Sequence, residues 1–184
     1  MDTIIVNLFG APGAGKSTMA SQVFSELKTL GVNAELVNEY AKAKVWDESV
    51  QHFKNQMYIV AKQSFYLSRV YGKVDVIVTD SPILLGLYYC RDMPFHSEHL
   101  DHVWKDIHAQ YDNMNYLLHR VKDYNPIGRF QNEEASNALG NRLYNLLNHH
   151  NIDYKIVDGS KAGGNIVIQE VCKRLGVNNE ETKR

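Results

Sequence analysis

The sequence contains little cysteine: Cys90 and Cys172 are the only two among 184 residues. Two cysteines are too few for a disulfide framework, and neither has a companion at the short spacing typical of a metal site. Small secreted domains that depend on several disulfides are therefore excluded as a class. Reduced, buried thiols are the expectation, which fits a cytoplasmic protein.

Long hydrophobic runs and an excess of one charge are also missing. No stretch approaches the roughly 18 consecutive apolar residues of a membrane span, and the residues after Met1 lack the basic region of a signal peptide. We therefore expect no membrane partner. Twenty basic residues nearly balance 21 acidic ones, for a formal net charge of −1. The chain as a whole is not built to attract nucleic acid, although a local basic segment could still do so.

What the sequence does contain is an alternation of short apolar runs with stretches of helical periodicity. This order predicts an α/β fold with a five-stranded parallel sheet and helices on both faces, in a single domain over residues 1–177. Residues 178–184 are expected to form a polar tail. Ligands of such sheets bind at the carboxyl ends of the strands, so the residues directly after each strand are candidates for function. The expected strands are residues 3–9, 33–37, 74–79, 115–119 and 153–157, and the expected helices are residues 16–30, 47–71, 97–111, 132–150 and 165–175.

The first strand is followed by a complete motif. Residues 10–17 read Gly-Ala-Pro-Gly-Ala-Gly-Lys-Ser and match the P-loop pattern G-x-x-x-x-G-K-[ST], between a strand and an amphipathic helix. Glycines let successive backbone N–H groups point at phosphate oxygens, Lys16 reaches the β- and γ-phosphates, and the Ser17 hydroxyl can ligate Mg²⁺. We therefore predict a P-loop NTPase fold that binds ATP with Mg²⁺. The residues expected to hold the nucleotide are Gly10, Ala11, Pro12, Gly13, Ala14, Gly15, Lys16, Ser17 and Thr18.

Two carboxylates follow other strands. Asp80 comes directly after residues 74–79, where the second acidic motif of P-loop proteins lies, so Ser17 and Asp80 are the expected Mg²⁺ ligands. The plainer alternative is that Asp80 caps the turn before Pro82. Glu39 follows the second strand, where it could accept the proton of an acceptor hydroxyl or could be an ordinary exposed loop residue.

Arg120 and Arg129 bracket a polar segment that contains proline and glycine and joins a strand to a helix. We expect residues 120–131 to form a short lid whose guanidinium groups neutralise the charge that develops during phosphoryl transfer. Solvated loop arginines are the alternative.

Four histidines within residues 96–108 invite a metal site. His99 and His102 lie off the apolar stripe of the expected helix, so we interpret them as part of a solvated face. Residues 41–73 are locally basic and rich in aromatic residues. Most of these aromatic side chains should face the core, while a minority could stack on a base beside a lysine.

The order of these features resembles the P-loop nucleoside and nucleotide kinase group. The resemblance spans nearly the whole chain, is carried most strongly by the P-loop, and is closest to nicotinamide-riboside-kinase-like domains and related small phage-type kinases. It implies Glu39 on the acceptor side, Asp80 on the Mg²⁺ side, and Arg120 and Arg129 in the lid. The sequence departs from deoxynucleoside kinases in having Asp80-Ser81-Pro82 in place of an acid-Arg-Ser motif, which argues against a deoxynucleoside acceptor.

The expected activity is ATP- and Mg²⁺-dependent transfer of the γ-phosphoryl group to a hydroxyl of a nucleoside- or nucleotide-like small molecule. One alternative acceptor is a hydroxylated base or an end of nucleic acid, held by residues 41–73. Another alternative is an ATPase switch that controls a partner, and a homodimer stays open. A GTPase is disfavoured because the sequence has no Asn-Lys-x-Asp motif for reading guanine. The expected catalytic residues are Lys16, Glu39, Asp80, Arg120 and Arg129.

Overall fold

The computed structural model describes residues 3–38, 55–91, 93–125 and 132–177. Its centre is a five-stranded sheet in the order β2-β3-β1-β4-β5, in which every neighbouring pair is parallel. The predicted α/β fold with a five-stranded parallel sheet is confirmed. The strands are β1 (Ile4–Phe9), β2 (Ala34–Val37), β3 (Val76–Thr79), β4 (Asp112–His119) and β5 (Lys155–Asp158).

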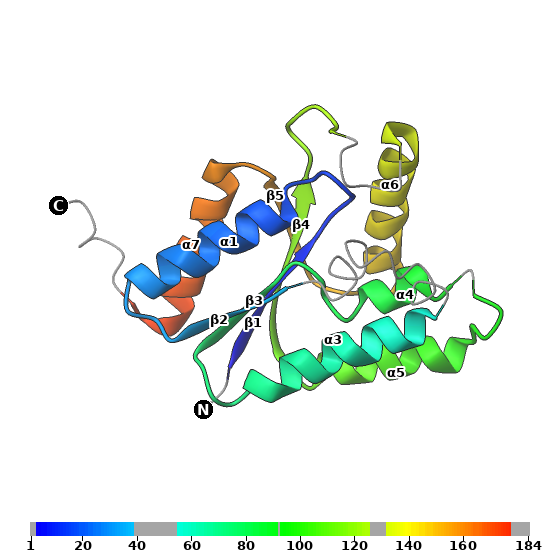
Figure 1. Ribbon diagram of the computed structural model, residues 1–184, viewed down its shortest axis with the longest axis horizontal. Helices are drawn as coiled ribbons and strands as arrows, with labels where there is room; N and C mark the ends of the chain where they lie inside the picture. The colour runs from blue at the N-terminus through cyan, green and yellow to red at the C-terminus, as the bar shows by residue number, and fades with distance from the viewer. Residues whose placement is uncertain (1–2, 39–54, 92, 126–131, 178–184) are drawn as a thin grey trace.

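Helices cover both faces of the sheet (Figure 1). One face carries α1 (Lys16–Thr29) and α7 (Lys161–Leu175). In the part of the chain that the structure describes, no helix is both long and apolar enough to cross a membrane. The other face carries α3 (Gln56–Val70), α4 (Leu85–Tyr89), α5 (Glu98–Ala109) and α6 (Glu133–His149).

Two apolar clusters lie on opposite faces of the sheet, because successive residues of a strand point to opposite faces. In β1, Ile4, Val6 and Leu8 pack toward α1 and α7, while Ile5 and Phe9 pack toward α3–α6. Every residue of β1 and β3 is buried, as expected for central strands covered on both sides. The core therefore fixes β1, and with it the segment that follows β1.

The strand β4 begins at Asp112, three residues before the predicted start, because its polar residues are satisfied inside the sheet. The buried amide of Asn7 in β1 donates to the Oδ1 atoms of Asn113 at 2.8 Å and Asn115 at 3.0 Å. Asn113 in turn donates to the carbonyl oxygens of His108 and Tyr111. A hydrophobic pattern cannot reveal such a strand, since its amides pair only after the chain has folded.

The predicted helix over residues 47–71 is described only from Gln56, and the expectation that aromatic side chains of residues 41–73 face the core is wrong for Phe65. Asn55 caps the helix by accepting from the Tyr58 N–H at 3.2 Å, while Asp47 lies outside the described residues. Phe65 is 53% exposed, whereas the polar side chain of Gln63 is 3% exposed. The short helix α4 was not predicted, because its five residues are too few to show a period.

The helix α7 begins at Lys161 instead of the predicted residue 165. Ser160 caps it by accepting from the Gly163 N–H at 3.2 Å. The pair Gly163-Gly164, which looks like a helix breaker, allows close packing instead: a Cβ on Gly163 would overlap the Asp158 carbonyl oxygen, and one on Gly164 would overlap the Gln22 amide of α1. Packing of α7 on α1 thus overrides the low helix propensity of glycine.

Both cysteines are free and buried, as predicted. Burial, followed by the negative charge of Asp101, raises the pKa of the Cys90 thiol to about 11. Burial also raises the pKa of Cys172. Neither thiol is therefore ionised at neutral pH, and both act as apolar packing groups.

Candidate active site

The P-loop follows β1 directly, and three of its glycines adopt backbone angles that other residues avoid. Gly10, Gly13 and Gly15 have φ values of 155°, 84° and 93°. Gly15 is the N-cap of α1, and the first turn of α1 contains no acidic residue. The amino terminus of α1 therefore keeps its partial positive charge, which favours a bound phosphate.

The Lys16 side chain folds back over this loop. Its Nζ donates to the carbonyl oxygens of Gly10 at 2.8 Å and Ala11 at 3.2 Å. These contacts hold the ammonium group above the loop backbone, where a phosphate group would lie. The Lys16 charge is thus placed before any ligand arrives.

Ser17 and Asp80 meet beside the loop. Asp80 directly follows β3 and is 3% exposed, and its Oδ2 accepts a hydrogen bond from the Ser17 Oγ at 2.6 Å. The β3 strand lies next to β1 in the sheet, which is why two residues 63 positions apart in the sequence come together. The structure therefore brings together the two residues predicted as Mg²⁺ ligands.

A buried polar cluster continues from Asp80 toward α3. The Thr79 Oγ1 accepts from the Ser81 N–H at 3.2 Å and from the Gln63 Nε2 at 3.3 Å. All three residues are buried. The end of β3 is thus tied to α3 on one side and, through Asp80, to the P-loop on the other.

Two other segments contact the P-loop from opposite sides. Gly159, at the end of β5, lies so close that a Cβ on it would overlap the Ala14 carbonyl oxygen. On the α6 side the fit is looser, since a Cβ on Gly140 would lie 3.5 Å from the Ala11 Cβ. The fully buried Ser136 of α6 donates from Oγ to the Pro12 carbonyl oxygen at 2.7 Å.

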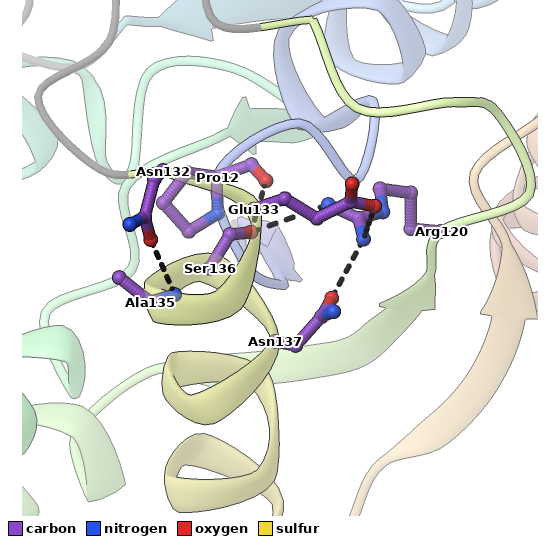
Figure 2. Close-up of polar contacts among 7 residues, drawn as sticks. All are labelled: Pro12, Arg120, Asn132, Glu133, Ala135, Ser136 and Asn137. Carbon is purple, nitrogen blue, oxygen red and sulfur yellow. Dashed lines mark hydrogen bonds and ion pairs between the residues drawn. The ribbon is translucent and has the colours of Figure 1, made fainter.

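Arg120, the first residue after β4, contacts the start of α6 (Figure 2). Its Nη2 lies 3.0 Å from Glu133 Oε1 and 2.6 Å from Asn137 Oδ1, and its Nη1 is 3.4 Å from Ser136 Oγ. The guanidinium also lies over the Tyr124 ring, 5.2 Å from its centroid. Arg120 is therefore a largely buried group, with 16% side-chain exposure, and not a solvated loop arginine.

Comparison with known proteins gives the family. The model of a family described as an AAA domain matches residues 5–162, which include the P-loop, Asp80 and Arg120. The chain belongs to this AAA-domain family. No curated protein matches the sequence.

Solved structures similar to this AAA-domain protein include two of deoxyadenosine kinase from M. mycoides. One, with the products dCMP and a flexible dCDP bound, is 18% identical with a TM-score of 0.55, covering 92% of this chain and 99% of that chain. The other, with dATP bound, is 20% identical with a TM-score of 0.50, covering 94% and 99%. These matches agree with the predicted P-loop kinase fold. The narrower resemblance to nicotinamide-riboside-kinase-like domains stays a prediction.

Two predicted catalytic residues, Glu39 and Arg129, lie outside the described residues, as do positions 126–131 of the predicted lid. Their roles stay predictions. His99 and His102 are exposed, whereas His108 is buried. Among the described residues, no group of three or more His, Cys, Asp or Glu side chains is arranged to hold a metal ion.

Sequence reasoning missed the buried polar residues that touch the site from the α3–α6 side. Gln63 and Ser136 lie on helices, among apolar residues, and carry no motif. One signal was available for Ser136, because it lies three residues before Leu139 and seven before Leu143, on the buried side of α6. A hydroxyl buried at such a position is expected to form a hydrogen bond with another part of the protein.

Proposed function

We propose that this AAA-domain protein is an ATP- and Mg²⁺-dependent kinase that transfers the γ-phosphoryl group to a hydroxyl of a nucleoside- or nucleotide-like small molecule. The observation that carries the proposal is the 2.6 Å hydrogen bond between Ser17 and the buried Asp80 at the amino terminus of α1. It joins the last residue of the P-loop motif to the acidic residue after β3.

This pair has the right chemistry for Mg²⁺. Magnesium prefers oxygen ligands, and P-loop proteins hold it with one hydroxyl and one carboxylate while phosphate and water oxygens complete the shell. Ser17 and Asp80 supply one oxygen of each kind. When bound, the ion would neutralise part of the charge on the transferring phosphoryl group.

The residues around the pair favour phosphate binding and water exclusion. The Lys16 ammonium is held over the loop by two carbonyl oxygens and would exchange those contacts for the β- and γ-phosphates. Arg120 lies at the edge of the P-loop, where its charge would act on the same phosphates. Catalysis would then come chiefly from positioning and electrostatics.

The acceptor hydroxyl needs a group that takes its proton. Glu39 remains our candidate for this role, because it follows β2 at the carboxyl edge of the sheet. The two similar solved structures, which carry nucleotides of deoxynucleosides, support a nucleoside-like acceptor in general. The Asp80-Ser81-Pro82 sequence continues to argue against a deoxynucleoside in particular.

A phosphate-transfer screen over nucleosides, nucleotides and oligonucleotides with radiolabelled ATP tests the proposal. The wild-type protein should label a nucleoside-like compound, and Lys16→Ala should lose at least about 100-fold of the rate while staying folded. Lys28→Ala, at an exposed position later in the same helix, is the matched control and should behave like wild type. Rapid hydrolysis of ATP without labelling of any acceptor would instead indicate an ATPase switch.

Two substitutions separate the carboxylates. Glu39→Gln should leave ATP affinity nearly intact and slow transfer by roughly 10²–10⁴-fold, with the lower end favoured by the loose transition state of phosphoryl transfer. Asp80→Asn should weaken Mg²⁺ dependence with every acceptor. A normal rate in Glu39→Gln would make Glu39 an ordinary loop residue and Asp80 the better candidate for the base.

A second acceptor class, single-stranded nucleic acid, is favoured by one surface. Along α3, Tyr58, Lys62, Phe65 and Arg69 recur at spacings of three and four residues and so form one stripe. Lys62 Nζ lies 5.7 Å from the Tyr58 ring centroid and 5.9 Å from that of Phe65, whose side chains are 38% and 53% exposed. The helix contains no acidic residue. Alternating aromatic rings and cations suit stacked bases and their phosphates.

The salt dependence of binding distinguishes the two acceptors. If nucleic acid presents the hydroxyl, a fluorescent single-stranded oligonucleotide should bind less tightly as salt rises, and Lys62→Ala should reduce that slope by about one unit. Lys28→Ala, on the opposite face of the sheet, should leave the slope unchanged. Transfer to a free nucleoside with no oligonucleotide binding would favour the small-molecule acceptor, which we prefer.

A further inference from the structure

Ser136 is a fully buried hydroxyl that the proposed function leaves without a task. It lies near the start of α6, four residues after the N-cap Asn132, with 0% exposure. Its single proton goes to the Pro12 carbonyl oxygen at 2.7 Å, a contact that joins segments 124 residues apart. The stability of α6 by itself does not explain a serine at this position, because serine is a weaker helix former than alanine. The hydroxyl therefore acts on the P-loop.

The Pro12 contact fixes the direction of a backbone amide. The peptide bond between Pro12 and Gly13 is trans, so its N–H points opposite to its C=O. With the carbonyl held toward α6, the N–H of Gly13 points away from α6. Gly13 adopts a φ of 84°, which few other residues tolerate. The orientation of this peptide is therefore fixed by the hydrogen bond to its carbonyl oxygen and by the backbone conformation of Gly13.

Ser136 also connects this peptide to Arg120. Its Oγ accepts from Arg120 Nη1 at 3.4 Å, while Arg120 Nη2 is held by Asn137 and Glu133 (Figure 2). One hydroxyl thus lies between the P-loop and the guanidinium expected to act on the phosphates. Replacing it would free the Pro12 carbonyl oxygen and remove the longest of the three Arg120 contacts, whereas replacing Asn137 would loosen only Arg120.

We propose that Ser136 is a positioning residue that orients the Pro12-Gly13 peptide of the P-loop for phosphate binding and holds Arg120 against the same loop. The proposal rests on the proposed function, in that the phosphates are those of ATP. It predicts that loss of the hydroxyl weakens the binding of phosphates more than it weakens the fold. A serine that only filled space in α6 would show the opposite pattern.

The test compares Ser136→Ala and Ser136→Cys with wild type, using calorimetry for ATP and adenosine binding and thermal unfolding without ligand. Alanine removes the hydroxyl, and cysteine keeps the volume but donates weakly. Both variants should bind ATP about 10-fold more weakly, because a hydrogen bond that positions a group against charge is lost. Binding of adenosine, which has no phosphate, should be unchanged. Asn141→Ala, at an exposed position of the same helix, is the control.

Asn137→Ala separates the effect on Arg120 from the effect on the P-loop, because it removes the 2.6 Å partner of Arg120 and leaves the Pro12 contact intact. Its ATP affinity should fall less than that of Ser136→Ala. Wild-type ATP affinity in either Ser136 variant, or a lower unfolding temperature with unchanged affinity, overturns the proposal. Since ATP binding needs no acceptor, a wild-type protein that binds ATP but labels nothing would refute the kinase and still test Ser136.

Discussion

The two faces of the sheet are built differently. Toward α1 and α7 the packing is apolar and close. Glycines allow the tight contacts there, because Gly159 meets the P-loop backbone at Ala14 and Gly164 meets the side-chain amide of Gln22 in α1. Toward α3–α6 the core contains buried polar side chains. Four of them pair across elements, namely Asn7, Gln63, Thr79 and Ser136, and His108 is also buried.

This difference teaches how a P-loop can be both rigid and adjustable. Backbone contacts have no rotamers to change, so the α7 side can only hold the loop in place. Side-chain hydrogen bonds can exchange partners when a ligand arrives. The α7 side therefore holds the P-loop through backbone contact at Gly159, while the α6 side holds it through the Ser136 side chain, which can change partners.

The largest expected effect concerns two glycines that contact the P-loop from opposite sides, and it tests whether the two sides hold the loop equally tightly. Gly159→Ala would drive a Cβ into the Ala14 carbonyl oxygen, so the loop must move, at a cost of about 2–4 kcal/mol of unfolding free energy. Gly140→Ala meets only ordinary contact at 3.5 Å and lies inside a helix, so it should stabilise by about 0.5–1 kcal/mol. Urea unfolding of both variants measures the difference, and equal effects would show that the two sides are equally tight.

The second prediction concerns pH and tests a polar group of the α3–α6 face. Burial lowers the pKa of His108 from 6.5 to about 4, so the unfolded chain binds a proton more readily than the folded one between these values. The unfolding free energy should therefore be unaffected by His108 above about pH 6.5 and fall by up to about 1.4 kcal/mol per unit as pH drops toward 4.

Unfolding by urea at several pH values measures this slope. His108→Gln should reduce it, while His99→Gln, at an exposed position of the same helix, should not. An unchanged slope in His108→Gln would mean that other groups cause the loss of stability in acid.

The smallest effect is expected on the α1/α7 face. The Tyr116 ring is buried, and its hydroxyl donates to Glu170 Oε2 at 2.8 Å, while burial and the nearby carboxylate raise the tyrosine pKa. Tyr116→Phe should cost only about 1 kcal/mol, because Glu170 keeps its 2.6 Å contact with Lys155. A cost above about 3 kcal/mol would show that this face also depends on a polar group.

The sequence was sufficient where local chemistry and fold agree. Runs rich in Val and Ile predicted β1 and β3, and the P-loop placed Lys16 and Ser17, because these features depend on neighbours in the chain. The meeting of Ser17 with Asp80 also followed, since parallel strands end at one edge of a sheet.

Features that depend on distant partners were not predictable. The polar start of β4 is stable only beside Asn7, and the glycines at the start of α7 are favourable only against β5 and α1. The exposed Phe65 and the buried Gln63 departed from the hydrophobic pattern of α3 for the same reason. The position of Ser136 among the buried residues of α6 could indicate a hydrogen bond but not its partner, because that partner in the P-loop lies 124 residues away.

The strand order has a consequence for the way the chain is made. The first strand, β1, pairs with β3 through residues 76–79 and with β4 through residues 112–117, so it has no sheet neighbour until those segments have been synthesised. The contacts of the P-loop with Ser136 and Gly159 need still later parts of the chain. Sheets assembled from such distant segments fold slowly. During translation the P-loop thus leaves the ribosome well before the segments that give it its folded shape.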